Sequence, residues 1–300
     1  MGATVTSLSA DLAAVVEAAS PSVARVEGRR RTASSAVVWS ADGVLVASHH
    51  ALDFDENVPV GLPDGRTVAA RVVGRDPGSD LAVLRVEASG LAPARWPAAA
   101  TPRVGEIVVS LSRPGRSARA RLGIVSAVGG EWRTPAGGRL ESYLETDVAL
   151  HPGFSGGLLA SASGAALGVS TAGLLRGGSL AVPGPAVRRV VESLLARGHM
   201  RRGWLGIGTQ PVALPAELRS RLGQPAGLIV LSVQPESPAA SAGLLLGDVL
   251  LRAGEERLTS PAALLPCLDE DRVGQALALS VLRAGEERSL VATVGEREGS

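Results

Sequence analysis

The sequence of 300 residues predicts a mostly β protein with a smaller α+β module on its C-terminal side. From Ser22 to about Pro183, short runs of Val, Leu and Ala alternate with glycine-containing turn signals, a pattern typical of antiparallel sheets. After residue 199 the pattern changes to strands interleaved with short helices. The length also exceeds what one core of usual size requires, which favours two domains.

The first domain is predicted to span residues 1–198 and to begin with a helix at about residues 8–20. Apolar residues recur there at helical spacing, and Pro21 ends the pattern. Further along, five turn signals separate the expected strands: ADG at 41–43, PDG at 63–65, RPG at 113–115, GG at 129–130 and GG at 137–138. They indicate a barrel or a sandwich. A helix from Pro185 to Gly198 closes the domain.

The second domain is predicted to span residues 203–296 after a linker at 199–202. Its expected strands are GLIVLSV, GDVLLRAG, ALALSVL and SLVATV, and its expected helices begin at ESPAASAG and SPAALLPCL. In the first of these helices Ser237 is the expected cap and Pro238 the first-turn residue. The alternation of these elements predicts a compact α+β module.

Composition and charge limit the expected partners. The formal net charge is +1 and the arginines are scattered among acidic residues, so no nucleic-acid surface is expected. No Cys or His pair stands at metal-ligand spacing and no phosphate loop is present, so neither a metal nor another cofactor is expected. The single cysteine, Cys267, excludes a disulfide within the chain and leaves a buried small hydrophobe or a free thiol.

The start of the chain bears on location. Residues 1–20, MGATVTSLSADLAAVVEAAS, contain neither a basic leader nor a continuous apolar stretch. The sequence as written therefore predicts a cytoplasmic protein without a membrane segment. If an export signal had been removed, the cell envelope would be expected instead.

Three short strings follow one order along the first domain: SHHAL around His50, DPGSDLAVL around Asp80 and HPGFSGG around Ser155. Histidine, aspartate and serine in this order are typical of one arrangement of a serine nucleophile, its base and the carboxylate that orients the base. The imidazole would accept the serine proton. Each string alone has a plainer interpretation, as a structural histidine, an aspartate that caps its turn or a Gly-Ser turn.

The glycines around Ser155 suggest a second function for this loop. Gly153, Gly156 and Gly157 allow backbone amides to crowd around the serine without Cβ clashes. In an oxyanion hole, the amides of Gly153 and Ser155 would donate to the substrate oxygen as it becomes an alkoxide.

Longer strings carry a resemblance to a known family. DGVLVASHHAL, DPGSDLAVLRV, VGEIVVSL, GIVSAVG, LETDVALHPGFSGGLL and GVSTAG occur in the order seen in the HtrA/DegP family of chymotrypsin-like serine proteases. Downstream, RRGWLGI and GLIVLSVQPESPAASAGLLLGDVLLRAGEERL resemble the PDZ domain that follows the protease in that family. The resemblance implies a chymotrypsin-like double β-barrel followed by one PDZ domain. It also implies a homotrimer.

The resemblance assigns roles to the residues that match. His50 becomes the base, Asp80 its orienting carboxylate and Ser155 the nucleophile, with the amides of Gly153 and Ser155 as oxyanion donors. The implied function is a serine endopeptidase that cleaves unfolded or misfolded polypeptides in protein quality control.

Two departures from the family pattern bear on the loop. Phe154 stands where the family usually has asparagine, and Ser112-Arg113-Pro114 stands where Gly-Asn-Pro is common. Because Phe154 lies between the two expected oxyanion donors, its side chain needs a pocket if the loop is to hold an active shape. The alternative function is therefore a catalytically weak or inactive PDZ-bearing scaffold or chaperone.

The resemblance also places a specificity pocket beside the serine. Its expected walls carry no acid that would pair with a Lys or Arg side chain, and they consist of Val148, Ala149, Leu150, Val169, Ser170 and Thr171. We therefore expect an uncharged aliphatic residue of small to medium size before the cleaved bond.

In the second domain, Trp204-Leu205-Gly206-Ile207 matches the carboxylate-binding loop of PDZ domains. Successive backbone amides of such a loop bind a peptide C-terminus while the peptide adds to the sheet as a strand. The expected partners are accordingly polypeptide substrates and peptide C-termini. A PDZ fold with a purely structural role is the alternative.

Overall fold

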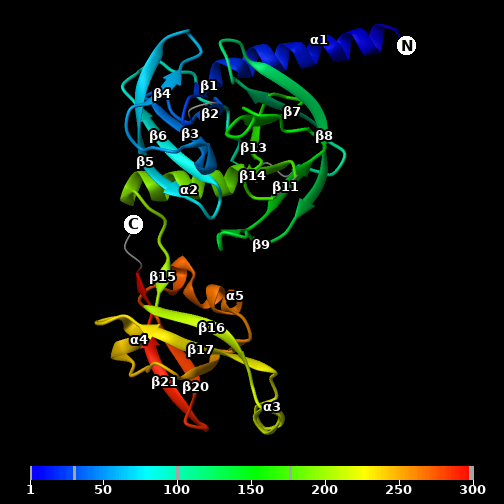
Figure 1. The fold of residues 1–300 in the computed structure, drawn as a ribbon. Helices are drawn as coiled ribbons and strands as arrows, with labels where there is room; N and C mark the ends of the chain where they lie inside the picture. Colours follow the sequence, from blue (N-terminus) through cyan, green and yellow to red (C-terminus); the bar gives the residue numbers. More distant parts are fainter. Residues whose placement is uncertain (1, 30–31, 99–101, 176–177, 297–300) are drawn as a thin grey trace. The chain divides into compact units, whose positions relative to one another are not determined.

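The computed structural model describes residues 2–29, 32–98, 102–175 and 178–296, which form two compact units, residues 1–200 and 201–300. The predicted fold class is confirmed: strands dominate, and the described part of the first unit contains two closed barrels (Figure 1). Because nothing fixes the position of one unit relative to the other, each is described by itself.

The first barrel has the strand order β1-β2-β3-β6-β5-β4 and closes where β1 pairs with β4. Its strands are β1 (Val23–Val26), β2 (Ser34–Val38), β3 (Val44–Ser48), β4 (Val58–Gly61), β5 (Thr67–Asp76) and β6 (Leu81–Val86). All residues of β2 and β3 are buried, consistent with their Val- and Ala-rich sequences. A single turn of 3-10 helix, η2 (His49–Ala51), follows β3.

The second barrel has the strand order β11-β14-β13-β12-β7-β8, and β11 pairs with β8 to close it. Its strands are β7 (Ile107–Ser112), β8 (Arg119–Gly129), β11 (Tyr143–Thr146), β12 (Leu158–Ser161), β13 (Ala166–Thr171) and β14 (Leu180–Pro183). A short hairpin of β9 (Trp132–Arg133) and β10 (Arg139–Leu140) extends from the β8–β11 connection. Pairing of β12 with both β7 and β13 puts the segment before β12 at one end of this barrel.

Two helices flank the barrels. α1 (Gly2–Ala19) continues into the 3-10 turn η1 (Ser20–Ser22), and α2 (Gly184–Arg197) ends at Gly198 in the left-handed conformation. α1 begins earlier than the expected residue 8 because residues 3–19 contain no glycine or proline to interrupt it. None of the described helices is long and apolar enough to cross a membrane.

The second unit is an antiparallel sheet with short helices. The sheet order is β16-β17-β18-β20-β21, β19 pairs with β18, and β15 pairs with β22. The elements are β15 (Gly203–Trp204), β16 (Ile207–Ala213), α3 (Ala216–Leu222), β17 (Ala226–Val233), α4 (Pro238–Ser241), β18 (Val249–Ala253), β19 (Glu256–Arg257), α5 (Pro261–Leu264), η3 (Leu265–Leu268), η4 (Glu270–Arg272), β20 (Ala276–Arg283), β21 (Glu286–Thr293) and β22 (Gly295–Glu296).

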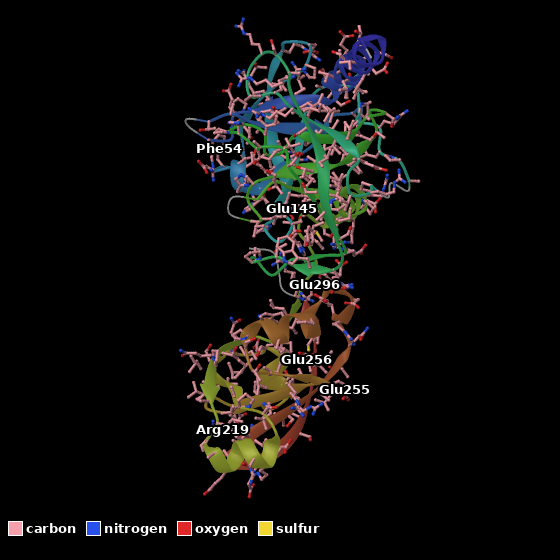
Figure 2. The ribbon with its side chains drawn as sticks, turned by 90° about the vertical axis from the view of Figure 1, so that its right-hand side faces the viewer. Phe54, Glu145, Arg219, Glu255, Glu256 and Glu296 are labelled. Atoms are coloured by element: carbon pink, nitrogen blue, oxygen red, sulfur yellow. The ribbon has the colours of Figure 1, made fainter. Side chains whose placement is uncertain are left out.

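Local chemistry explains these elements. The Ser237 hydroxyl accepts a hydrogen bond of 3.1 Å from the Ala240 amide and so caps α4. Cys267 is buried in the core of this unit, as a small hydrophobe would be. α3 has no buried residue, and Arg219 lies on its exposed surface (Figure 2), which is why no apolar pattern predicts it.

Candidate active site

His50 and Asp80 form a directly bonded pair in the first unit. The His50 ring nitrogen Nδ1 lies 2.7 Å from Asp80 Oδ2, and the His50 backbone amide donates to Oδ1 at 2.9 Å. η2 presents the histidine at the end of β3, and the turn between β5 and β6 presents the aspartate with φ +58°. Aspartate is among the few residues that tolerate this left-handed conformation. β3 and β6 pair through Ser48 and Leu81, so the side chains of His50 and Asp80 meet at one end of the barrel.

The Thr171 hydroxyl is a third partner of this pair. It donates to Asp80 Oδ2, and it accepts a hydrogen bond of 2.9 Å from the Gly173 amide. Burial by itself opposes ionisation of Asp80, but the hydrogen bonds from His50 and Thr171 outweigh it and hold the Asp80 pKa below its usual value. An ionised Asp80 accepts the Nδ1 proton of His50, which leaves Nε2 free to accept another.

Gly173 lies against the same pair. A Cβ atom at this position would come within 2.5 Å of His50 Nδ1 and 2.7 Å of Asp80 Oδ2. The missing side chain therefore allows the segment after β13 to cover the pair closely.

Ser155 lies beside this segment, in the serine loop, which we define as residues 151–157. Its hydroxyl oxygen accepts a hydrogen bond of 3.3 Å from the Ala172 amide. Ala172 is flanked by Thr171 and Gly173, which contact Asp80 and His50. The structure thus brings the three residues of the predicted triad to one place, and no hydrogen bond joins Ser155 to His50 among the described residues. Hydrogen bonds of this kind are often loose in unliganded proteases.

The backbone of the serine loop leaves two amides available. The Phe154 amide donates to the His151 carbonyl at 3.0 Å, and Gly153 has φ +94°, as the third residue of a type II turn requires. The Phe154 carbonyl accepts from Gly157 at 2.9 Å. Among the described residues, the amides of Gly153 and Ser155 find no acceptor in the protein, which is what an oxyanion hole requires.

Phe154 has the pocket that its size demands. Its side chain is buried, with 3% of the residue exposed, and the guanidinium carbon of Arg121 lies 5.4 Å from the centre of its ring. This geometry is typical of a cation–π interaction. The departure from the usual asparagine is therefore accommodated in a buried position beside Arg121.

The first three predicted pocket residues precede the serine loop. Val148 is buried in an apolar cluster of the second barrel, and Leu150 packs half-buried against that cluster. Ala149, between them, is exposed. The exposed face of this segment is therefore uncharged and small.

The other three predicted pocket residues lie on β13. Val169 is buried in the core, and Ser170 Oγ lies 3.2 Å from the buried Ser110 Oγ. Thr171 turns its hydroxyl to Asp80. Its contact with the aspartate is a role that the sequence analysis missed, because nothing local to the GVST string indicates a partner 91 positions away.

In the second unit, the Trp204–Ile207 segment forms a glycine-centred loop between β15 and β16. Gly206 has φ +78°, and Leu205 is buried in the core. The Leu205 carbonyl accepts from the Ala239 amide at 3.0 Å, and the Gly206 carbonyl accepts from the Gln234 amide at 2.8 Å. Because peptide groups are planar and trans, the amides of Gly206 and Ile207 point to the opposite side.

The described residues contain no group of three His, Cys, Asp or Glu side chains that could hold a metal ion.

Comparisons with known proteins identify the family. Residues 34–169 match the trypsin-like peptidase domain, and residues 203–294 match the PDZ domain. The structure of the HtrA-type protease AlgW with a tripeptide is 33% identical, with 96% of this chain and 98% of that chain covered and a TM-score of 0.69. The structure of the serine endoprotease from Yersinia pestis is 28% identical, with 95% of this chain and 97% of that chain covered and a TM-score of 0.71. The chain belongs to the family of HtrA-type serine proteases, which confirms the resemblance.

Two curated relatives add their location. The probable periplasmic DegP-like serine endoprotease of Halomonas elongata is 32% identical over 273 residues, which are 89% of this chain and 57% of the relative. The corresponding protein of Pseudomonas savastanoi is 32% identical over 283 residues, which are 92% of this chain and 58% of the relative. The chain thus spans less than two thirds of these relatives. The predicted cytoplasmic location is wrong, because these relatives are periplasmic by name and the first 20 residues alone do not decide where a protein works.

Proposed function

We propose that this chain is a serine endopeptidase of the cell envelope that cleaves unfolded or misfolded polypeptides. Residues 1–198 carry out hydrolysis, and residues 203–296 bind peptide C-termini. The observation that carries this proposal is the His50–Asp80 pair beside a serine loop with two unpaired amides. A buried carboxylate, an imidazole and a serine next to available amides form the set of groups that acyl transfer needs.

The first half of the reaction forms an acyl-enzyme. The Ser155 side chain turns from the Ala172 amide toward His50, and its oxygen attacks the carbonyl carbon of the peptide bond. The serine proton moves to His50 Nε2, and ionised Asp80 stabilises the imidazolium through Nδ1. The amides of Gly153 and Ser155 bind the developing oxyanion. His50 then protonates the departing amine as the carbon–nitrogen bond breaks.

The second half releases the acyl group. A water molecule replaces the amine, and His50 removes its proton as the water oxygen attacks the ester carbon. A second oxyanion forms at the same amides, the ester bond breaks, and His50 returns the proton to Ser155 Oγ. The enzyme is regenerated and no cofactor is consumed.

The Trp204–Ile207 loop is the proposed site for peptide C-termini. Its buried carbonyls and opposed amides fit capture of a carboxylate, with the peptide added along the sheet edge. The related AlgW protease has been solved with a decapeptide and with a tripeptide. The homotrimer remains a proposal from family resemblance, and light scattering on the purified chain tests it.

The cleavage preference is proposed from the uncharged pocket segments. An aliphatic residue of small to medium size before the cleaved bond fits Ala149 and Leu150. A library of peptide substrates varied at that position tests this, and a strong preference for Lys or Arg would contradict it.

The decisive experiment compares the wild type with Ser155→Ala. Casein breakdown and labelling by a fluorophosphonate are expected in the wild type, and both should vanish in the variant. If neither protein is labelled, even with C-terminal peptides added, the scaffold or chaperone function is favoured instead.

A further inference from the structure

Ser35, on β2, holds the serine loop with both its side chain and its backbone. It is fully buried; its hydroxyl donates to the Gly153 carbonyl at 2.8 Å, and its amide donates to the Ser155 carbonyl at 3.1 Å. Those carbonyls belong to the peptide groups before and after the one that carries the Ser155 amide. With the Phe154 carbonyl bound to Gly157, three consecutive peptide planes are fixed.

Arg113 in turn holds Ser35. The Arg113 backbone amide donates to Ser35 Oγ at 2.8 Å, which orients the hydroxyl so that its proton points to Gly153. The next residue, Pro114, touches the loop directly, since a Cβ atom on Gly153 would lie 2.5 Å from the Pro114 Cβ. The segment of residues 113–114 thus supports the loop at two points.

The Arg113 side chain is anchored at the base of α1. It is buried, with 7% of the residue exposed, and its three donor nitrogens bind carbonyl oxygens. Nε donates to Val23 at 2.6 Å, Nη2 to Ser20 at 2.9 Å and Nη1 to Arg116 at 2.8 Å. Burying a guanidinium is costly unless its donors are satisfied, so these bonds hold the 113–114 segment firmly against η1 and β1.

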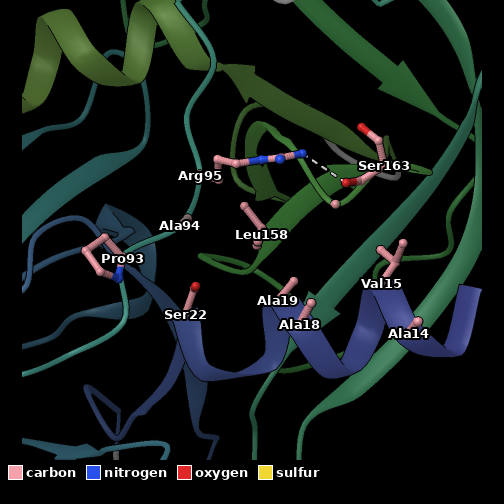
Figure 3. Close-up of a pocket in the computed structure, with 11 residues that line it drawn as sticks. Ala14, Val15, Ala18, Ala19, Ser22, Pro93, Ala94, Arg95, Leu158 and Ser163 are labelled. Carbon is pink, nitrogen blue, oxygen red and sulfur yellow. Dashed lines mark hydrogen bonds between the residues drawn. The ribbon is translucent and has the colours of Figure 1, made fainter.

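η1 joins this anchor to α1. The Ser20 hydroxyl donates to the Val16 carbonyl at 2.6 Å, which ties η1 to the last turn of α1. Ala18 and Ala19 on that turn line a cavity of about 410 Å³ together with Leu158 (Figure 3). Leu158 directly follows the serine loop. The cavity is therefore a second place, besides the Arg113 contacts, where the last turn of α1 lies close to the loop.

We propose that Arg113 and Ser35 form a positioning link that fixes the oxyanion amides of the serine loop to the base of α1. Neither residue touches substrate; both act through the orientation of the Gly153–Phe154 and Ser155–Gly156 peptide groups, which flank the peptide group of the Ser155 amide. The proposal rests on the proposed peptidase function for its kinetic consequence. It concerns two residues to which no catalytic role was assigned, and one of them, Arg113, departs from the family's usual asparagine.

Three single variants and one double variant of the full chain test the link. Ser35→Ala removes the hydroxyl that joins the two segments, and Arg113→Met removes the anchor while keeping a long side chain. Ser112→Ala is the matched control, because the neighbouring Ser112 hydroxyl is equally buried and has no hydrogen-bond partner in the described part of the chain. All variants are compared at equal folded fraction, verified by thermal unfolding.

The kinetic readout is the division of the effect between kcat and KM. A misplaced oxyanion loop costs about ten- to hundredfold in rate, so kcat is expected to fall by that factor in Ser35→Ala, with KM within about twofold. Arg113→Met should lose about tenfold, and the double variant no more than the larger single loss, because both residues act through one link. Ser112→Ala should retain wild-type kcat. Additive losses, or a kcat unchanged in Ser35→Ala, would overturn the proposal.

Hydrogen exchange of the peptide covering residues 151–157 measures the loop independently of turnover. Exchange there should rise in Ser35→Ala and Arg113→Met and stay unchanged in Ser112→Ala. If the wild type is inactive, the proposed function fails while this measurement still tests the link. Unchanged exchange in both link variants would refute it.

Discussion

The serine loop of the first unit and the Trp204–Ile207 loop of the second solve one problem in two ways. Each must present backbone amides to a negatively charged oxygen, and each does so by binding its own carbonyls inside the protein. In the serine loop, the Gly153 carbonyl is held by one buried side chain, the Ser35 hydroxyl, while the Phe154 and Ser155 carbonyls are held by backbone amides. In the Trp204–Ile207 loop, the Leu205 and Gly206 carbonyls are held by backbone amides.

This difference predicts different sensitivities. A carbonyl held by a hydroxyl loses its donor when one oxygen atom is deleted, whereas carbonyls held by backbone amides keep their donors in most side-chain deletions. Both loops share one weak point, a glycine with positive φ whose missing Cβ allows a close contact. Substitution of these glycines should therefore have the largest effects.

Gly153→Ala is expected to lower kcat by about a hundredfold or more, comparable to the loss of an oxyanion donor. The new Cβ would lie 2.5 Å from Pro114 Cβ at a φ of +94°, so the loop must shift. Steady-state kinetics with a peptide substrate measure the loss. Gly164→Ala is the control for positive φ alone, because its Cβ would meet only Val15 at 3.9 Å, and its kcat should stay at the wild-type value.

Gly206→Ala is expected to weaken binding of a peptide C-terminus by about tenfold, or 1.4 kcal/mol. Its Cβ would lie 2.3 Å from the Ser237 Cβ, which forces the loop away from α4. Fluorescence anisotropy of a labelled peptide measures the affinity, and Gly285→Ala, with positive φ and open space, is the control. Equal losses in both variants would show that backbone strain alone matters.

The sequence is sufficient to predict the strands and the general location of both loops, but not the contacts that hold the loops in place. His50, Asp80 and Ser155 stand in strings whose chemistry is recognisable locally. Ser35 stands in no such string. Its hydroxyl binds Gly153, which lies 118 positions further along the chain, and only the closing of the barrels brings the two together. Such contacts depend on strand register, which no short pattern contains.

Other differences have local causes. α3 was not predicted because its residues bury no apolar face, and α1 begins before the expected position because residues 3–7 contain no glycine or proline to interrupt it. The start of α1 and the presence of α3 are therefore not indicated by the spacing of apolar residues.

Acid should loosen the segment around Asp248 in the second unit. Asp248 is buried, yet hydrogen bonds from Arg283 and the Leu245 amide outweigh the cost of burial and hold its pKa below the usual value. This contribution to stability is present above the unfolded carboxyl pKa of about 3.9 and is lost as pH falls through the lowered folded value.

Asp248→Asn should therefore destabilise the second unit at pH 7 by about 1–3 kcal/mol, the cost of a buried hydrogen bond to a charged group. The deficit relative to wild type should shrink as pH falls below about 3.9, because the unfolded carboxyl then takes up a proton, and it should vanish once pH has passed the lowered pKa of the folded state. Hydrogen exchange of the 244–253 segment across this range measures the difference. Glu286→Gln, which breaks an exposed contact with Arg288, should show no such pH dependence.

The smallest effect is expected from Ser237→Ala, the counterpart of Ser35→Ala in the second unit. Its hydroxyl caps α4 by accepting from Ala240, and α4 holds the loop through the Ala239 amide. Loss of the cap costs about 1 kcal/mol, but the backbone bond to Leu205 remains. Peptide affinity should fall by less than about fivefold, which corresponds to a loss of less than about 1 kcal/mol of binding free energy. A loss as large as in Gly206→Ala would mean that this loop, too, depends on a single hydroxyl, and the distinction between the two loops would fail.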